Sequence, residues 1–409
     1  MPDSDYDVFV GIDWASATHQ VCILDAGGRV RAEVTVAHSG AGLQQLVGEV
    51  AAVSQEAGRV AAGIEMPHGA VVDTLIAHGV HVYAVNPKQV DRFRDRHTVA
   101  GAKDDRRDAY VLADALRTDR HAYRRVKPED PRLAEVRELS RMHGELTEEH
   151  TRLTNRLREQ LQRFFPEPLT LCPGADEPWL WRLLERAPTP AEARRLRRST
   201  LAALLAEHHI RRVTAGALHD ALRAVPLPAG PGTVAAARTH IAVLLPRLRL
   251  VHEQRAACAR QLTRALEELA RGEQREHRDV SIIRSVAGVG TLVAATMLAE
   301  AWEALAERDY QRLRAHSGVA PVTRQSGQRR RVIMRRSCNP RLRAAVFHWA
   351  RNSVRVDPRT REHYARLRRT HGHARALRGV ADRLLGMLIT LLRNSTVYDS
   401  ARRAAPIAA

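Results

Sequence analysis

The order of strand-like and helix-like segments at the start of the chain constrains its fold more than any other feature. Three short apolar runs, two of them separated by the turn "DAGGR", predict an antiparallel meander of strands at residues 8–12, 20–24 and 30–36. A helix, a strand, a helix and a strand are then predicted at residues 42–57, 60–65, 70–78 and 80–87. Because strands that alternate with helices usually pair in parallel, the sequence predicts a mixed sheet.

A meander followed by β-α-β-α is the order found in ribonuclease-H-like and actin-like folds. An actin-like ATPase would also carry a second glycine-rich phosphate loop after a strand, and the sequence has none. We therefore expect a ribonuclease-H-like α/β domain at the N-terminus.

The remainder of the chain has helical patterns. Apolar residues at helical spacing predict two long amphipathic helices, at residues 131–165 and 248–271, which could form an antiparallel pair, a coiled-coil stalk or an ordinary bundle seam. The proline-rich stretch 166–246 between them predicts an inserted helical subdomain. We expect an α/β domain, a coiled-coil linker with this insert, a mainly α-helical C-terminal domain and a tail, at residues 1–125, 126–280, 281–395 and 396–409.

The formal net charge of +19 and a pI near 10.9 favour an acidic partner, and nucleic acid is the commonest one. The four cysteines form no CxxC pair, which argues against a zinc site or a disulfide framework and fits a reducing cytoplasm. The sequence shows neither a signal-peptide pattern nor an apolar run of about 20 residues. We therefore expect a cytoplasmic, nucleoid-associated protein that binds no membrane.

Four acidic residues stand where neither a core nor an ordinary helix face needs them. Asp13 follows the first strand, and Glu65 ends the strand "VAAGIE", at the edge where α/β folds place their sites. In "GAKDDRRDAYVLADAL", Asp105 and Asp108 are three residues apart at the start of a helix and project from one face. A ribonuclease-H-like sheet has its first and fourth strands side by side, so Asp13 would lie close to Glu65, and the helix could deliver the other two acids.

Clustered carboxylates repel one another unless a cation lies among them. Ligation by oxygen alone favours Mg²⁺, with Mn²⁺ as the alternative, and two such ions about 4 Å apart would stabilise the attacking and leaving oxygens of a phosphodiester. Taken singly, each acid has a simpler explanation as a turn cap, a salt-bridge partner or a first-turn residue favoured by the helix dipole. Asp104 competes with Asp105 for a ligand role, and Asp114 is a weaker candidate.

The second half of the chain carries a glycine motif and a dense group of arginines. The stretch "SVAGVGTLVAATMLAE", with Gly288 and Gly290, has the form of a helix-hairpin-helix, whose backbone N–H groups meet a phosphate; a plain tight turn is the alternative. Residues 323–370 contain 15 arginines against two acids, which predicts salt-dependent binding to a phosphate backbone.

Within this segment, "PVTRQSGQRRRV" places Ser326 beside a glycine and among arginines. A serine alone is a poor nucleophile, but guanidinium groups and a metal could stabilise its alkoxide and the phosphorane that it would form. A simple turn is the alternative. The arginines expected to contact nucleic acid are Arg324, Arg329, Arg330, Arg331, Arg335 and Arg336.

The order of these motifs resembles that of the DEDD transposases of the insertion-sequence 110 family, whose relatives include Piv-type DNA invertases and bridge-RNA-guided recombinases. The resemblance covers residues 7–165 and 250–394 and lies in "GIDWA", "GIE", "VNPKQV…KDDRRDA", "SVAGVGTLVAATMLAE", "AHSGVAPVTRQSGQ" and "MRRSCNPRLRAAVF". It implies a RuvC-like domain that holds magnesium through Asp13, Glu65, Asp105 and Asp108. A coiled coil would join this domain to a C-terminal transposase domain.

The resemblance also implies that a serine of the C-terminal domain, here Ser326, attacks DNA to give a covalent phosphoserine intermediate. It implies a homodimer or homotetramer in which catalytic domains of different protomers combine, and, in some members, a noncoding guide RNA that selects target and donor. The leading hypothesis is a DNA recombinase that acts on the ends of its element and on a target. A RuvC-like structure-specific nuclease using water as nucleophile, and a catalytically inactive nucleic-acid-binding regulator, are the alternatives.

Overall fold

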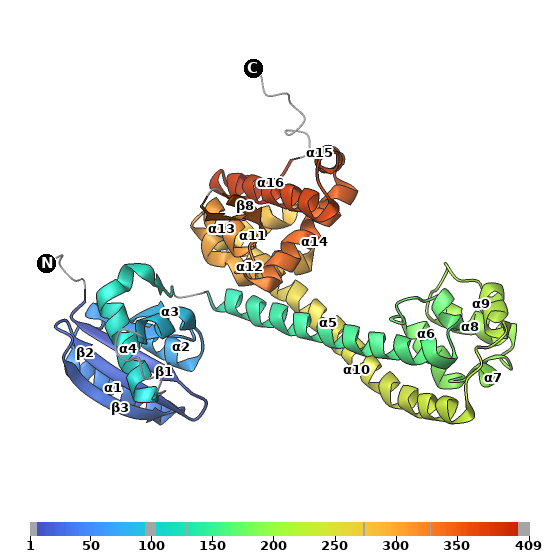
Figure 1. Ribbon diagram of the computed structural model, residues 1–409, viewed down its shortest axis with the longest axis horizontal. Helices are drawn as coiled ribbons and strands as arrows, with labels where there is room; N and C mark the ends of the chain where they lie inside the picture. Colours follow the sequence, from blue (N-terminus) through green and yellow to red (C-terminus); the bar gives the residue numbers. More distant parts are fainter. Residues whose placement is uncertain (1–5, 95–103, 128–129, 273–274, 328, 400–409) are drawn as a thin grey trace, which may run out of the picture. The chain divides into compact units, whose positions relative to one another are not determined.

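The computed structural model describes residues 6–94, 104–127, 130–272, 275–327 and 329–399 (Figure 1). The chain divides into two compact units, Met1–Glu129 and Asp130–Ala409. Within the described residues, the first unit is a sheet with helices on both faces, and the second is helical apart from one two-stranded hairpin.

The sheet of the first unit has the strand order β3-β2-β1-β4-β5-β6. Its first three strands form an antiparallel meander, β4 and β5 extend it in parallel from β1, and β6 pairs antiparallel at the edge. The predicted meander with its parallel extension is confirmed. The strands are β1 (Val8–Trp14), β2 (Thr18–Asp25), β3 (Val30–Ala37), β4 (Val60–Ile64), β5 (His81–Ala84) and β6 (Arg124–Arg125).

Helices cover both faces of this sheet because successive strand residues point to opposite sides. Val10 and Ile12 lie in the core that includes α1 and α2, whereas Phe9 and Ala61 pack with Ala109 of α4. Both faces of the central strands are therefore buried. The helical segments are α1 (Gly40–Val53), α2 (Ala70–Ala77), α3 (Pro87–Arg94), α4 (Asp105–Asp119) and the 3₁₀ turns η1 (Ala57–Arg59) and η2 (Arg120–Ala122).

Two glycines let α4 lie directly on the sheet. A Cβ added at Gly11 of β1 would lie 1.9 Å from the carbonyl oxygen of Ala109, and one at Gly63 of β4 would lie 3.3 Å from that of Leu112. A side chain at Gly11 is therefore incompatible with the observed position of α4.

The second unit is built around two long helices, α5 (Pro131–Phe164) and α10 (Pro231–Ala270) (Figure 1). The Cys258 thiol donates to the carbonyl oxygen of Leu139 at 3.4 Å, while Arg247, earlier in α10, lies 4.0 Å from Glu149, later in α5. The helices therefore run antiparallel, which is one of the three arrangements that the sequence left open.

The second long helix begins at Pro231, well before the predicted residue 248, because it continues through Pro246. A proline inside a helix removes one hydrogen bond and costs about 3 kcal/mol, which is why the sequence predicts a boundary there. Leu245 and Leu248 on either side of the proline are buried in the core, and this packing holds the helix together. The predicted insert, 166–246, is thus too long at its C-terminal end.

The insert itself is a small helical subdomain with its own core. Trp179 and Trp181 are fully buried there and share the core with Phe164 of α5 and Ile241 of α10. Its elements are η3 (Glu167–Thr170), α6 (Pro178–Arg186), α7 (Pro190–Ala193), α8 (Arg198–Glu207) and α9 (Ala215–Arg223).

The C-terminal part of the second unit packs around the other end of the helix pair. Leu133 of α5 and Leu266 of α10 join one core with α12, α14 and α16. The sequence predicts this region as helical, and the structure adds a β-hairpin. The elements are α11 (Arg275–Ser285), α12 (Thr291–Ala306), α13 (Tyr310–His316), β7 (Val322–Ser326), β8 (Arg329–Ile333), α14 (Pro340–Val356), α15 (Pro358–Arg368) and α16 (His373–Arg393).

None of the described helices combines the length and the apolar character that a bilayer-spanning segment needs.

Candidate functional site

Asp13 and Glu65 lie at the carboxyl ends of neighbouring parallel strands. Asp13 is part of β1, and Glu65 directly follows β4. The register pairs Ile12 with Ile64, so Asp13 and Glu65 are the next positions along the two strands. Both residues are half-buried. This edge of the sheet therefore carries two acidic positions side by side.

The first turn of α4 lies at the same edge, because α4 runs antiparallel to β1. Arg120, just after α4, stacks 4.7 Å above the ring of Tyr6, which precedes β1. The first half of α4, at Ala109, rests on Gly11. The N-terminal end of α4, with Asp105 and Asp108, must then lie toward the carboxyl end of β1.

Side-chain alternation places the strand acids on the face that α4 covers. Positions 11 and 63 face α4, since a Cβ at either glycine would contact that helix. Asp13 and Glu65 come two positions later and share that face where the strand geometry continues. On the helix, Asp108 is buried and Asp105 is exposed.

The four acids share an edge, but within the described residues no three of their carboxylates have the spacing of ligands around one ion. Oxygen ligands of one Mg²⁺ lie about 2.1 Å from the ion, hence within about 4.2 Å of one another. Among the described residues, the group of three or more whose ligand atoms all lie within 4.8 Å is Cys172, Asp176 and Glu177. Side-chain rotation is therefore required before three of the four acids could share one ion.

The two competing acids have structural partners. Asp104 is the N-cap of α4, and its carboxylate accepts a hydrogen bond from the backbone N–H of Arg106 at 3.2 Å. Asp114 lies 2.6 Å from Arg117, one turn later on the same helix. Capping explains the first and ion pairing explains the second.

The trio in the insert has the spacing of a metal site but not its chemistry. Burial and the negative charge of Glu177 raise the pKa of the Cys172 thiol to about 11, so the thiol keeps its proton at neutral pH and is a poor ligand. The Glu177 carboxylate already accepts hydrogen bonds from Arg212 and, at 3.0 Å, from the indole of Trp179. These contacts fix the loop before α6.

The C-terminal hairpin brings arginines into register with Ser326. Residues Arg324 and Arg331 pair across β7 and β8, as do Ser326 and Arg329, and Gly327 at the turn has a φ of +55°. Directly paired and alternate positions share one face of a hairpin, so these four positions lie on the same face. Arg324 and Arg331 thus place two positive charges directly opposite one another, an arrangement that is destabilising in the absence of a compensating charge.

The exposure of the predicted arginines differs from one to the next. Arg335 is half-buried, and its carbonyl oxygen accepts a hydrogen bond from Arg343 at 2.5 Å. The side chains of Ser326 and Arg330 lie outside the described part of the structure. The exposed members are Arg324, Arg329, Arg331 and Arg336.

The two motif glycines have different surroundings. Gly288, at a φ of +82°, lies against α14, where an added Cβ would lie 2.6 Å from the hydroxyl of Ser353. That hydroxyl donates to the carbonyl oxygen of Ala287 at 2.7 Å. Gly290 is the N-cap of α12 and has open space around it. Close packing thus accounts for Gly288, and only Gly290 borders a helix N-terminus with room beside it.

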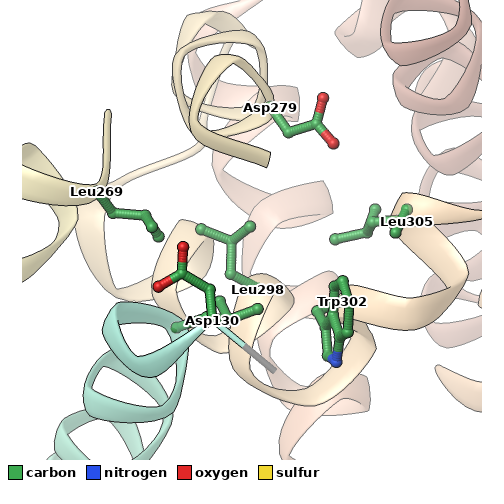
Figure 2. A pocket seen from close by; sticks show the side chains of 8 residues that line it. Asp130, Leu269, Asp279, Leu298, Trp302 and Leu305 are labelled. Atoms are coloured by element: carbon green, nitrogen blue, oxygen red, sulfur yellow. The ribbon is translucent and has the colours of Figure 1, made fainter. Parts of the chain in front are cut away.

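A hollow in the second unit is too small to bind a substrate. It is bordered by Leu269, Asp279, Leu298 and Trp302 (Figure 2), and its volume is 20 Å³. A buried water needs about 10–15 Å³ by the same measure, so the hollow holds little more than one water molecule.

Glu300, an acid with a buried side chain, and its partner Asn339 are not among the residues that the sequence predicts to be functional. The Glu300 side chain is only 6% exposed, although it ends an otherwise apolar stretch of α12. A single carboxylate in a run such as "LVAATMLAE" is the signal that could have singled it out.

Both halves of the chain are similar to known transposases. Residues 10–166 match a DEDD family model described as "Transposase", and residues 280–365 match one described as "Transposase IS116/IS110/IS902 family". The mini-circle putative transposase for IS117 of Streptomyces coelicolor is 33% identical over 100% of this chain and 99% of that protein. An IS110 uncharacterized 43.6 kDa protein of the same organism is 30% identical over 97% and 96%. Putative transposase y4uE of Sinorhizobium fredii is 48% identical over 51% of this chain and 58% of that protein.

Proposed function

Because this chain belongs to the IS110 family of insertion-sequence transposases, we propose that it cleaves and rejoins DNA with divalent cations and a serine nucleophile. It is accordingly an enzyme that acts on DNA, and its DEDD family indicates dependence on a divalent metal. The observation that carries the proposal is the position of Asp13 and Glu65 at adjacent carboxyl ends of β1 and β4, with the first turn of α4 at the same edge.

We propose that the first unit is a RuvC-like domain. Support comes from the order β3-β2-β1-β4-β5, an antiparallel meander with a parallel extension. In such a sheet, ligands bind at the carboxyl ends of the strands, where the acids of this chain lie. The division at residues 1–125, 126–280, 281–395 and 396–409 remains our proposal for the domains.

We assign the divalent ions, Mg²⁺ before Mn²⁺, to Asp13, Glu65, Asp105 and Asp108. The donor set fits, because carboxylate oxygens are the ligands that Mg²⁺ prefers. When bound, the ions would act as Lewis acids on phosphoryl oxygens. The chain itself supplies a rigid backbone, because the sheet is buried on both faces. The four carboxylates would therefore approach the ions by side-chain rotation alone.

Ser326 is the proposed nucleophile. Its oxygen would form a bond to a DNA phosphorus while the bond from that phosphorus to a deoxyribose oxygen breaks, and the serine proton would pass to the released hydroxyl. The register with Arg329, and the neighbouring pair of Arg324 and Arg331, supports this assignment. Guanidinium groups at these positions would stabilise the negative charge on the phosphoryl oxygens.

The remaining basic and glycine residues are proposed to bind the phosphate backbone of the element ends and of the target. They comprise Gly288 and Gly290 in a helix-hairpin-helix formed by α11 and α12, and the arginines Arg324, Arg329, Arg330, Arg331, Arg335 and Arg336. The open space around Gly290 supports a phosphate contact there, whereas Gly288 would act by shaping the turn.

We also propose that the protein uses a noncoding guide RNA from its element, forms a homodimer or homotetramer, and works in the cytoplasm at the nucleoid. Purification from cells that carry the whole element, followed by sequencing of the bound RNA and measurement of mass in solution, tests these points. Absence of an element-derived RNA would contradict the guided mechanism.

The central experiment is a search for a covalent protein–DNA adduct with labelled element ends and Mg²⁺. We expect the adduct with the unmodified protein and its loss in Ser326→Ala. Ser337→Ala is the matched control, because Ser337 is an exposed serine between β8 and α14 in the same basic segment. Cleavage that persists in Ser326→Ala would identify a RuvC-like nuclease instead, and DNA binding without cleavage in the unmodified protein would identify an inactive regulator.

A further inference from the structure

The segment that carries the β7–β8 hairpin is closed at its base. Before the hairpin, His316 ends α13, and after it, Asn339 is the N-cap of α14, with its side-chain oxygen accepting from the N–H of Leu342 at 3.0 Å. The backbone N–H of Asn339 donates to the carbonyl oxygen of His316 at 2.9 Å. Residues 316–339 therefore form a loop whose two ends meet.

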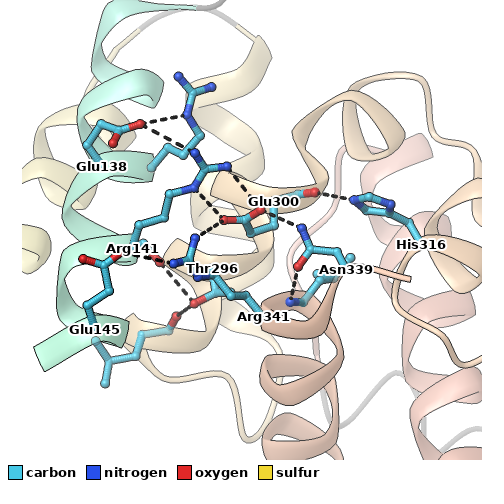
Figure 3. Close-up of polar contacts among 12 residues, drawn as sticks. Glu138, Arg141, Glu145, Thr296, Glu300, His316, Asn339 and Arg341 are labelled. Atoms are coloured by element: carbon cyan, nitrogen blue, oxygen red, sulfur yellow. Dashed lines mark hydrogen bonds and ion pairs between the residues drawn. The ribbon is translucent and has the colours of Figure 1, made fainter. Parts of the chain in front are cut away.

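Both ends of this loop are fastened to Glu300 of α12 (Figure 3). The Nε2 atom of His316 lies 3.0 Å from the backbone carbonyl oxygen of Glu300, and the amide of Asn339 donates to the Glu300 carboxylate at 2.7 Å. One residue thus bonds to both ends, through its backbone to one and through its side chain to the other.

The same carboxylate also joins α5. Arg141 donates to it from Nε at 3.0 Å and from a terminal nitrogen at 3.5 Å. Arg341, in the first turn of α14, lies 4.0 Å from it and donates to Glu145 of α5 at 3.3 Å. Figure 3 shows these side chains converging on Glu300 from α5 and from α14.

Burial makes this carboxylate sensitive to its partners. Burial alone would raise the pKa of Glu300, but the hydrogen bonds from Arg141 and Asn339 and the charges of Arg141 and Arg341 lower the pKa below its ordinary value. The carboxylate is therefore ionised at neutral pH, and removal of its charge would weaken its hydrogen bonds from Arg141 and Asn339.

The hairpin needs such an anchor, because it has little core of its own. Each strand has five residues, and Val332, at 59% exposed, points into solvent. An isolated two-stranded hairpin is at best marginally stable in water. Its orientation must therefore come from the base of the loop.

We propose that Glu300 is the positioning residue that fixes the β7–β8 hairpin relative to α5. Only the role of the hairpin, which is to present Ser326 and its neighbouring arginines to DNA, rests on the proposed function. Glu303, one turn later on the same helix, binds Arg312 of α13 at 2.5 Å.

Hydrogen exchange of Glu300→Gln, in the full chain without DNA, tests the anchor directly. We expect amides of β7 and β8 to exchange about tenfold faster or more, since hydrogen bonds to a charged group are stronger than those to a neutral one. Amides of α16, in the core of the same domain, should keep their rates. Glu303→Gln is the matched control, being the same change one turn away. Unchanged hairpin exchange, or equal acceleration in α16, would overturn the proposal.

A second variant keeps the test valid if Glu300→Gln fails to fold. Asn339→Asp retains the cap acceptor for Leu342 but replaces the amide donor with a second carboxylate, so the hairpin amides should again exchange faster. Combining it with Glu300→Gln restores a hydrogen bond with donor and acceptor exchanged, and the rates should return toward the original. Acceleration that persists in the double variant would contradict a direct contact.

Strand cleavage gives a separate result. Glu300→Gln should lower the cleavage rate at saturating DNA by roughly tenfold to a hundredfold, because a misplaced reacting group lowers the rate even when the DNA is bound. Normal cleavage alongside faster hairpin exchange would overturn the link between positioning and reaction. An unmodified protein that forms no serine adduct would disprove the proposed function, while the exchange experiment would still decide the anchor.

Discussion

Gly11 of β1 lies directly beneath Ala109 of α4, so closely that a Cβ on the glycine would come within 1.9 Å of the Ala109 carbonyl oxygen. This contact sets the distance between the helix that carries Asp105 and Asp108 and the strand that carries Asp13. The geometry of the acidic edge therefore depends on a residue without a side chain.

Gly11→Ala should displace α4 and destabilise the first unit by about 1–3 kcal/mol or more, the usual cost of overpacking a core. Chemical unfolding of the full chain, with hydrogen exchange to report on the sheet, measures this. Gly48→Ala, in the open on α1, is the control, and there the change should stabilise by up to about 1 kcal/mol. Equal effects of the two substitutions would contradict the close contact.

Asp105→Asn should weaken binding of Mn²⁺, measured by calorimetry on the full chain, by about tenfold or more, since a ligand carboxylate contributes more than the outer residues whose loss costs 10–100-fold. Asp104→Asn is the control, because it makes the same chemical change at the neighbouring residue. Asparagine caps a helix as well as aspartate does, so the substitution removes a neighbouring charge while it preserves α4. If both variants bound Mn²⁺ equally, Asp105 would not be a ligand.

Arg324→Ala should weaken binding to duplex DNA about uniformly across sequences and reduce the slope of log affinity against log salt by about 0.9, as expected for one phosphate contact. Arg331→Ala should do the same, because the two arginines are directly paired. Arg249→Ala serves for comparison, since Arg249 already binds Glu185 at 2.8 Å. A salt slope unaffected by either hairpin substitution would exclude the hairpin from the phosphate backbone.

The helix pair should lose stability in mild acid because of His150. This residue is 4% exposed, and its ring lies 5.9 Å from that of Trp181 and 5.6 Å from that of His252. Burial first, and then the positive charges of Arg255 and His252, lower its pKa from 6.5 to about 4, while Asp176 opposes the shift in part.

The folded state therefore leaves His150 neutral at pH values where the unfolded chain binds a proton. Stability from this residue is complete above pH 6.5 and falls as the pH drops from about 6.5 to about 4, by about 1.4 kcal/mol per unit. Urea unfolding followed by tryptophan fluorescence measures the slope, since Trp179 and Trp181 lie in this core. His150→Leu should flatten the slope more than His240→Leu, a change at a half-buried histidine of α10. An unaltered slope in His150→Leu would assign the acid sensitivity elsewhere.

Much of the first unit could be predicted from the sequence because local patterns there agree with the final packing. The strands of the meander either alternate between apolar and polar residues or are apolar throughout. The acids lie directly at the ends of these elements, where a charged residue is easily distinguished from the apolar pattern. The positions of Asp13 and Glu65 on neighbouring strands follow from strand order alone. The approach of their carboxylates to a shared ion depends on side-chain rotamers, which no sequence pattern specifies.

Other features were beyond local patterns. The sequence predicts too late a start for α10 because Pro246 locally disfavours a helix, and burial of residues such as Leu245 overrides this preference. The strands of the hairpin are dense in arginine and lack a hydrophobic face. The role of Glu300 depends on its contacts with Arg141 and Asn339, which are far away in the sequence and so cannot be predicted from a local pattern.

The antiparallel course of α5 and α10 limits how proteins of this architecture can diverge in length. A deletion in the C-terminal half of α5, next to the insert, would leave side chains of α10 without packing partners, and the reverse also holds. Deletions must therefore be matched in both helices. Each matched pair would shift the outer subdomain along the axis by about 1.5 Å and turn it by about 100°. Matched insertions of whole helical turns would keep the rotation of the insert subdomain nearly unchanged. The common length of the two helices thus determines how far the insert subdomain lies from the C-terminal domain.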